Sequence, residues 1–254
     1  MAGRVSQQLI AGLFWLLCFG QAMAEKEITI LVGYSLDDDN ISAGPDTFQI
    51  FQNGKGTVSL DESYRYSGYR SIRFNDIPND NDFPELQGYF NAIEQDVIYF
   101  HFVLMTTDAN ESFNIALAGK KGFSLEKNGI GFWLFNDNGL LRHYSDGIPK
   151  KLFQLQSFLW YLVDVSYNLK DGRYDLSIET EYGKTLTRLT AVINASNNPQ
   201  SEINMFSFIG DLKDSQAAEF YVDDIVVSAN RPINKSEFAA PGRKKLFVDI
   251  WHDY

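Results

Sequence analysis

The chain of 254 residues has a formal net charge of −11, and aromatic residues make up 15% of it. This acidity, without any basic stripe or basic–aromatic array, excludes a nucleic-acid-binding protein and disfavours binding to anionic membrane surfaces. The single cysteine, Cys18, excludes a disulfide framework. The fold must therefore be stabilised by its hydrophobic core, for which a chain of this length is ample.

The first residues predict a secretory signal peptide. Arg4 precedes an apolar segment from Leu9 to Gly20, and Ala22-Met23-Ala24 supplies the small residues of a cleavage site. The apolar segment is too short for a membrane span, and an uncleaved N-terminal anchor is the alternative. We expect residues 1–24 to be removed, leaving a secreted or periplasmic protein that is not inserted in a membrane.

The rest of the chain is predicted to be almost wholly β-strand. Runs of aromatic and β-branched residues alternate with turn sequences such as Asp137-Asn138-Gly139 and Lys170-Asp171-Gly172. In chain order the expected strands are EITILVGYSL, two within GTVSLDESYRYSGYRSIRF, GYFNAI, DVIYFHFVLMTT, ESFNIALAG, GIGFWLFND, GLLRHYSDG, FLWYLVDVSYNL, RYDLSIETEYG, KTLTRLTAVI, INMFSFIGD and FYVDDIVVSA. Short strands at near-regular spacing, with no long helical period, predict one all-β domain, an antiparallel sandwich or barrel, over residues 25–229. Residues 230–254 form a tail that either docks through its last apolar residues or is frayed.

Several short patterns, in this order, resemble the concanavalin A-like (laminin G-like) jelly rolls of bacterial secreted proteins and the carbohydrate-binding modules related to them. The segment FLWYLVDVSYNLKDGRYDLSI resembles the W-Y-x-V hairpin of that family, and FYVDDIVV resembles its closing strand. The front of the pattern is carried by Asp37, Asp39, Gly44, Pro45, Ser67, Gly68 and Ser71. The resemblance spans nearly all of residues 31–229 and implies an antiparallel jelly-roll sandwich, but it contains no catalytic signature.

Two neighbouring acids, Asp223 and Asp224, lie within an apolar strand sequence. Because successive side chains of a strand alternate, we expect them to point to opposite faces. The resemblance implies a structural calcium ion that ties an N-terminal acidic turn, through Asp37 and Asp39, to Asp223 or Asp224 of the closing strand. The alternative is a solvated turn, with one strand aspartate in solvent and the other paired with an arginine such as Arg73.

Linear motifs of catalysis are missing. There is no G-x-S-x-G sequence, and no histidine-rich metal spacing. We expect His101 to be a satisfied core or sheet-face histidine, and His143 to be the more exposed candidate for substrate contact. Glu179 and Glu181 share a strand face, but nothing extends them into the acid series of a retaining glycosidase. The sequence therefore favours a non-catalytic protein, although a site assembled from distant residues would leave no linear motif.

The segment GFWLFNDNGLLRHYSDG is the candidate binding site, because carbohydrate recognition uses exposed aromatic faces with amides and carboxylates beside them. Trp133 and Phe135 share a strand face that Tyr144 can approach, unless both are core residues. The candidate ligand-binding residues are Trp133, Phe135, Asn136, Asp137, Arg142, His143, Tyr144 and Asp146. We predict a secreted protein that binds a glycan or another surface ligand. The alternatives are a polysaccharide lyase or glycoside hydrolase on a jelly-roll fold, and a structural or adhesive envelope protein.

Overall fold

The computed structural model describes residues 27–34, 36, 48–52, 55–79, 83–91, 95–119, 129–196, 202–210 and 217–234. The expected signal peptide, the acidic turn with Asp37 and Asp39, and the tail beyond Asn234 lie outside the described residues. No helix in these ranges is long and apolar enough to cross a membrane.

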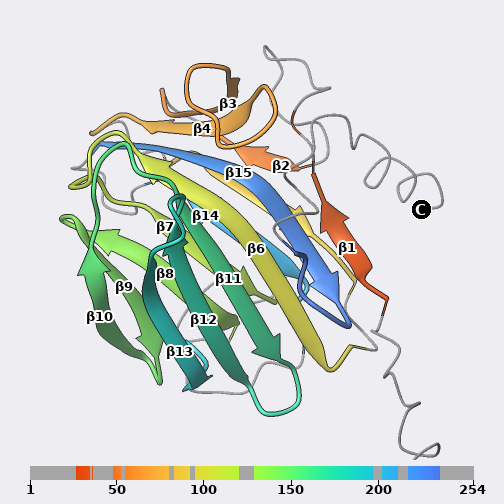
Figure 1. The fold of residues 1–254 in the computed structure, drawn as a ribbon. Coiled ribbons are helices and arrows are strands. Elements are labelled where there is room, and N and C mark those ends of the chain that lie inside the picture. Colours follow the sequence, from red (N-terminus) through yellow and green to blue (C-terminus); the bar gives the residue numbers. More distant parts are fainter. Residues whose placement is uncertain are drawn as a thin grey trace, which may run out of the picture.

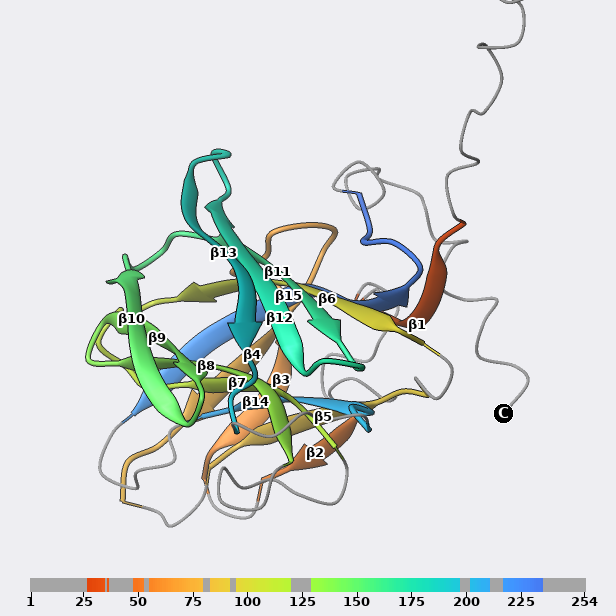
Figure 2. The same cartoon turned by 90° about the horizontal axis from the view of Figure 1, so that it is seen from below.

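The described residues form two antiparallel sheets that pack face to face, as the sequence predicts (Figures 1 and 2). Sheet A has the strand order β13–β12–β11–β6–β15–β4–β3, with β1 also paired to β15. Sheet B has the order β10–β9–β8–β7–β14–β5–β2. The strands of sheet A are β1 (Thr29–Gly33), β3 (Thr57–Asp61), β4 (Ser71–Asp76), β6 (Val97–Thr106), β11 (Tyr161–Asn168), β12 (Arg173–Thr180), β13 (Thr185–Ile193) and β15 (Ala218–Ala229). The strands of sheet B are β2 (Gln49–Phe51), β5 (Glu85–Tyr89), β7 (Asn114–Ala118), β8 (Ile130–Asp137), β9 (Leu140–Ser145), β10 (Ile148–Gln154) and β14 (Met205–Ile209).

Aromatic rings fill the space between the two sheets. Phe100 of sheet A stacks on Phe206 of sheet B with ring centroids 5.3 Å apart. Phe206 lies opposite Gly88 in the register of β14 and β5, where a Cβ atom would be 2.1 Å from the phenyl ring. The absence of a side chain at Gly88 therefore makes room for the Phe206 ring, which is fully buried in the core.

A second, smaller apolar cluster lies on the outer face of sheet A. Trp160 is buried here with Val103, Met105, Leu162 and Tyr221 rather than between the sheets. The rings of Tyr64 and Tyr66, from the segment between β3 and β4, pack on Tyr221 and Trp160 respectively. This segment covers the cluster and closes one end of the outer face.

The two neighbouring aspartates of β15 do not point to opposite faces. The register with β6 shifts between Asp223 and Val226, and Asp224 has a φ of 49°. This β-bulge inserts an extra residue, so the alternation that the prediction assumed is broken. Both carboxylates reach the same segment: the backbone N–H groups of Tyr66 and Ser67 donate to Asp223, and the Ser67 hydroxyl donates to Asp224.

The solvated alternative for these acids is also wrong. Asp223 and Asp224 are only 3% and 8% exposed. Arg73, the suggested ion-pair partner, is paired with Glu219 at 2.6 Å instead.

Candidate functional site

The outer face of sheet B carries three packed aromatic side chains. Alternation along β8 sends Phe132 into the core and turns Trp133 and Phe135 outward. Tyr144 on β9 lies between them, with its ring centroid 4.8 Å from that of Trp133 and 5.1 Å from that of Phe135. All three rings are half-buried, so each keeps a surface towards solvent.

The indole of Trp133 is held in place by a side chain from the next strand. Its Nε1–H donates to Oδ1 of Asn114 on β7 at 3.0 Å. Ala116, directly opposite Trp133 in the register, adds little bulk beside the ring. The orientation of the aromatic surface is therefore fixed by the sheet itself.

Beyond β7, the same face carries polar side chains beside two apolar ones of β14, Met205 and Ile209. Outward positions of β5 carry Glu85, Gln87 and Tyr89, and the adjacent outward position of β14 carries Ser207. The Ser207 hydroxyl and the Gln87 amide N–H both donate to Oε1 of Glu85 at 2.6 Å. The Tyr89 hydroxyl donates to Oε1 of the Gln87 side chain, and burial, with Glu85 nearby, raises the pKa of Tyr89. Such a connected network holds its donors and acceptors in defined directions.

We call this surface the aromatic–amide face. It consists of Glu85, Gln87, Tyr89, Asn114, Trp133, Phe135, Tyr144 and Ser207. The residues of β5 were missed because the sequence places the strand at GYFNAI, from Gly88 onwards, whereas it begins at Glu85. The alternation E-L-Q-G-Y, with polar residues at every second position, was the signal that could have found them.

Arg142 and Asp137 lie at the edge of this face. Arg142 is paired with Phe135 in the register of β8 and β9, and its Nε is 3.2 Å from a carboxylate oxygen of Asp137. This ion pair borders the aromatic side chains. Asp146 lies further away, in the turn after β9 with a φ of 59°, where its backbone N–H donates to the Asn194 carbonyl.

His143 is not an exposed residue, contrary to the prediction. Its side chain turns into the core, is 4% exposed, and Nδ1 lies 2.5 Å from the Tyr174 hydroxyl. That hydroxyl donates to the Tyr144 carbonyl, so Nδ1 of His143 is the donor of the pair. Burial lowers the pKa of His143, which favours the neutral imidazole.

Asn136 also turns inward, and is 3% exposed. Its amide nitrogen donates to the backbone carbonyls of Ala109 and Glu111. Asn136 therefore holds the segment between β6 and β7 and does not reach the aromatic–amide face.

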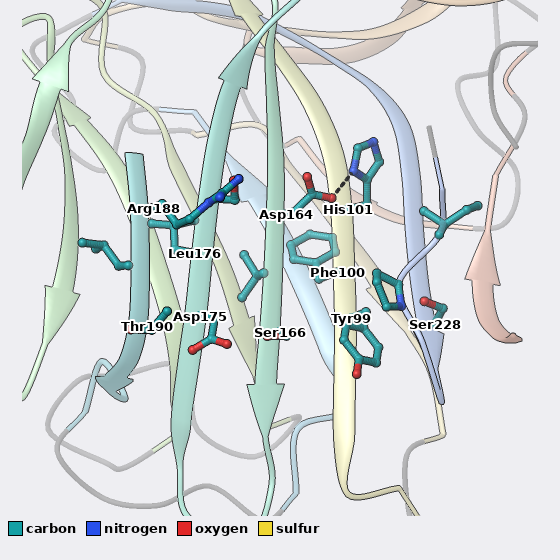
Figure 3. A pocket seen from close by; sticks show the side chains of 15 residues that line it. Tyr99, Phe100, His101, Asp164, Ser166, Asp175, Leu176, Arg188, Thr190 and Ser228 are labelled. Carbon is teal, nitrogen blue, oxygen red and sulfur yellow. Dashed lines mark hydrogen bonds and ion pairs between the residues drawn. The ribbon is translucent and has the colours of Figure 1, made fainter. Parts of the chain in front are cut away.

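The outer face of sheet A presents different chemistry. A hollow of about 270 Å³ lies across β6, β11, β12, β13 and β15 (Figure 3). Nδ1 of His101 is 2.7 Å from Oδ1 of Asp164 on the adjacent strand. His101 is a satisfied sheet-face histidine, as expected from its apolar strand, but it faces this hollow rather than the core.

The expected calcium ligands are only partly within the described residues. Burial, followed by the neighbouring Asp224 carboxylate, raises the pKa of Asp223. The backbone N–H of Tyr34, just after β1, donates to the Ile225 carbonyl, so the chain leaves β1 beside the two aspartates. The described ranges contain no group of three or more His, Cys, Asp or Glu side chains that could hold a metal ion, and Asp37 and Asp39 lie outside them.

No protein-family model matches the chain, and no curated protein matches it. Solved structures with a similar fold include a sialidase, 13% identical with a TM-score of 0.58 over 79% of this chain. The chain spans only 19% of the length of that sialidase. The catalytic domain of a glycoside hydrolase family 131 protein from Coprinopsis cinerea is 15% identical, with a TM-score of 0.55, over 78% of this chain and 94% of its own. An endo-β-1,4-glucuronan lyase from Trichoderma reesei is 14% identical, with a TM-score of 0.52, over 81% of this chain and 95% of its own. At these identities the likeness shows the fold, a jelly-roll-like β-sandwich that carbohydrate-active domains use.

Proposed function

We propose that this protein binds a glycan on the aromatic–amide face of sheet B. The observation that carries the proposal is the placement of three partly exposed aromatic rings beside a row of amide, carboxylate and hydroxyl groups on one sheet face. Sugar rings present apolar C–H faces that pack on aromatic side chains, and equatorial hydroxyls that pair with amides and carboxylates. The face offers both kinds of contact on one sheet, with β7 and β14 lying between the aromatic rings of β8 and the polar row of β5.

The polar side of the face favours a neutral glycan over a uronate polymer. Glu85 accepts hydrogen bonds from two neighbours, as expected of a carboxylate. Its negative charge would repel a uronate carboxylate bound beside it. The expected secretion of the chain would place such a protein where extracellular polysaccharides occur.

Cleavage of a polysaccharide is the second candidate function. It is supported by Glu85 and Tyr89, an acid and a phenol on one network, and by the hydrolase and lyase names among structures of similar fold. Two-carboxylate glycoside hydrolysis needs a second acid across the scissile bond. Among the described residues of this region the other carboxylate, Asp137, is already paired with Arg142. The names of the structures with a similar fold favour cleavage, whereas the described geometry of this face favours binding.

We further propose that Asp223 and Asp224 hold a structural calcium ion together with Asp37 and Asp39. Hard carboxylate oxygens are the ligands that calcium prefers. Both strand carboxylates lie on the same side of the bulge, and the chain after β1 runs beside them. The ion would tie the segment after β1 to the closing strand, β15.

The glycan proposal is tested by titrating the protein with soluble neutral polysaccharides, namely β-glucan, xylan and mannan, in a calorimeter, with a glucuronan as the anionic probe. We expect one neutral polymer to bind and Trp133→Ala to abolish the heat. Tyr182→Ala is the matched control, because Tyr182 is 83% exposed at a turn remote from the face. Reducing-end and unsaturated-product assays on the same mixtures distinguish binding from cleavage. Binding that survives both Trp133→Ala and Gln87→Ala would overturn the proposal.

A further inference from the structure

The hollow on the outer face of sheet A lies on the opposite side of the sandwich from the aromatic–amide face. It is formed where the outward side chains of five adjacent strands meet residues 232 and 233, which follow β15. Figure 3 shows its polar side chains gathered over β6, β11, β12 and β13. Its volume of about 270 Å³ suits one small ligand rather than a polymer.

One row of side chains crosses four strands of the hollow. In the sheet register His101 is opposite Asp164, Asp164 is opposite Ser177, and Ser177 is opposite Arg188. The row therefore offers an imidazole, a carboxylate, a hydroxyl and a guanidinium in sequence. A second row lies next to it, with Tyr99 opposite Ser166 and Ser166 opposite Asp175.

The pair of His101 and Asp164 gives the hollow polar groups that are held in fixed positions. His101 is 6% exposed, although it lies on an outer sheet face. Burying a polar ring is costly unless it is hydrogen-bonded, and the 2.7 Å contact with Asp164 provides that bond. The bond also fixes the orientation of the Asp164 carboxylate, which stays partly exposed.

The charges of the hollow select the kind of ligand. Asp164 and Asp175 contribute two carboxylates, whereas Arg188 contributes the opposing guanidinium and already lies 3.9 Å from Glu179. An anionic ligand would therefore meet net repulsion. Vicinal hydroxyl groups, in contrast, can donate to the carboxylates and accept from the guanidinium.

The wall of the hollow supplies the apolar contact that such a ligand needs. The Tyr99 ring lies over β6 (Figure 3), and Pro232 and Ile233 also line the hollow. A pyranose combines apolar C–H faces with vicinal hydroxyls, and matches this combination of groups.

We propose that the hollow is a second binding site, which takes a single sugar unit without negative charge. The site does not rest on the proposed function of sheet B, because the two surfaces share no residue and face away from each other. A protein with both sites would bind a polymer on one face and a terminal or free sugar on the other.

The experiment is saturation-transfer NMR of the full-length protein with methyl glucoside, methyl galactoside, N-acetylglucosamine and glucuronate as separate probes. At least one neutral probe should receive saturation and shift the imidazole resonances of His101, whereas glucuronate should not. Asp164→Asn removes the carboxylate charge, and should weaken binding by about tenfold. Ser166→Leu should block the hollow sterically while leaving its charges in place.

Tyr182→Ala, at an exposed turn outside both surfaces, is the matched control and should leave binding of the single sugar unchanged. If Trp133→Ala removes sugar binding and Ser166→Leu does not, the sugar binds on sheet B and the second site is refuted. If no neutral probe receives saturation at millimolar concentration, the second site is refuted as well. Neither result alters the polymer titration that tests the aromatic–amide face.

Discussion

The two outer faces of this sandwich follow the same alternation rule yet present opposite chemistry. On sheet B the outward positions hold Trp133, Phe135 and Tyr144 beside an amide–carboxylate network. On sheet A they hold His101, Asp164 and their neighbours around a hollow. The inward positions of both sheets are mostly apolar, so most of the difference lies in the outward residues, which are every second residue of each strand.

This difference shows that the core and the surfaces of a sandwich can vary independently. Phe100 and Phe206 hold the sheets together whichever residues stand on the outside. The outer faces differ also in how they are supported: sheet A relies on the buried aspartates under the segment of Tyr66 and Ser67, and sheet B on close packing at Gly88. Changes directed at one support should leave the other face intact.

The largest effect is expected from Asp223→Ala. The substitution removes the acceptor of three backbone N–H groups, those of Tyr66, Ser67 and Asp224. Leaving buried donors without an acceptor should lower the free energy of unfolding by about 3 kcal/mol. Chemical denaturation measures the change. Asp96→Ala, which breaks a surface ion pair with Lys170, is the control and should change stability little. A loss no larger than that of the control would show that Asp223 does not hold the segment.

Calcium should stabilise the wild-type protein by a similar amount. If the ion binds at Asp223 and Asp224, calcium at a hundredfold above its dissociation constant adds about 2.7 kcal/mol. Thermal unfolding with EGTA and then with millimolar calcium would show a rise of several degrees. The rise should disappear in Asp224→Ala. An equal midpoint in both buffers would rule out the calcium proposal.

Gly88→Ala should lower the stability of the protein through sheet B. The added methyl group would overlap the Phe206 ring, and overpacking of this kind lowers the free energy of unfolding by about 2 kcal/mol. Denaturant titration measures the loss, and a Phe206→Leu background should recover part of it by making room. A neutral Gly88→Ala substitution would mean that the ring can move aside without cost.

His143 should make a smaller, pH-dependent contribution to the free energy of unfolding. Its folded-state pKa is lowered by burial, so below about pH 6.5 the unfolded chain takes up a proton that the folded chain does not. The free energy of unfolding should therefore fall as the pH drops from about 7.5 to about 5.5, by the contribution of this group. His143→Gln, which cannot titrate, should show a fall smaller by that amount. Identical pH profiles would contradict the burial of a neutral imidazole.

The sequence was sufficient to predict the β-sandwich fold and part of the aromatic–amide face. Alternation within GFWLFND placed Trp133 and Phe135 on one face, and the hairpin brought Tyr144 beside them. The same alternation in LLRHYS predicts that His143 points to the other face of the strand from Arg142 and Tyr144. That face is the core, where the structure has His143.

Other features needed information that periodicity does not contain. A β-bulge at Asp224 depends on pairing with β6, so it is not visible in a single strand. The hollow on sheet A combines β6 and β11 with β13 and β15, strands that only the sheet order brings together. His101 could therefore be assigned to a sheet face from its sequence, but its partner Asp164 could not.

A crossed binding measurement on Trp133→Ala and Asp164→Asn, with a neutral polysaccharide and a neutral methyl glycoside, tests the two sites together. We expect Trp133→Ala to lose the polymer but keep the glycoside, and Asp164→Asn to keep the polymer but bind the glycoside about tenfold more weakly. Polymer binding that is unaffected by Trp133→Ala would show that the aromatic–amide face of sheet B does not recognise a glycan.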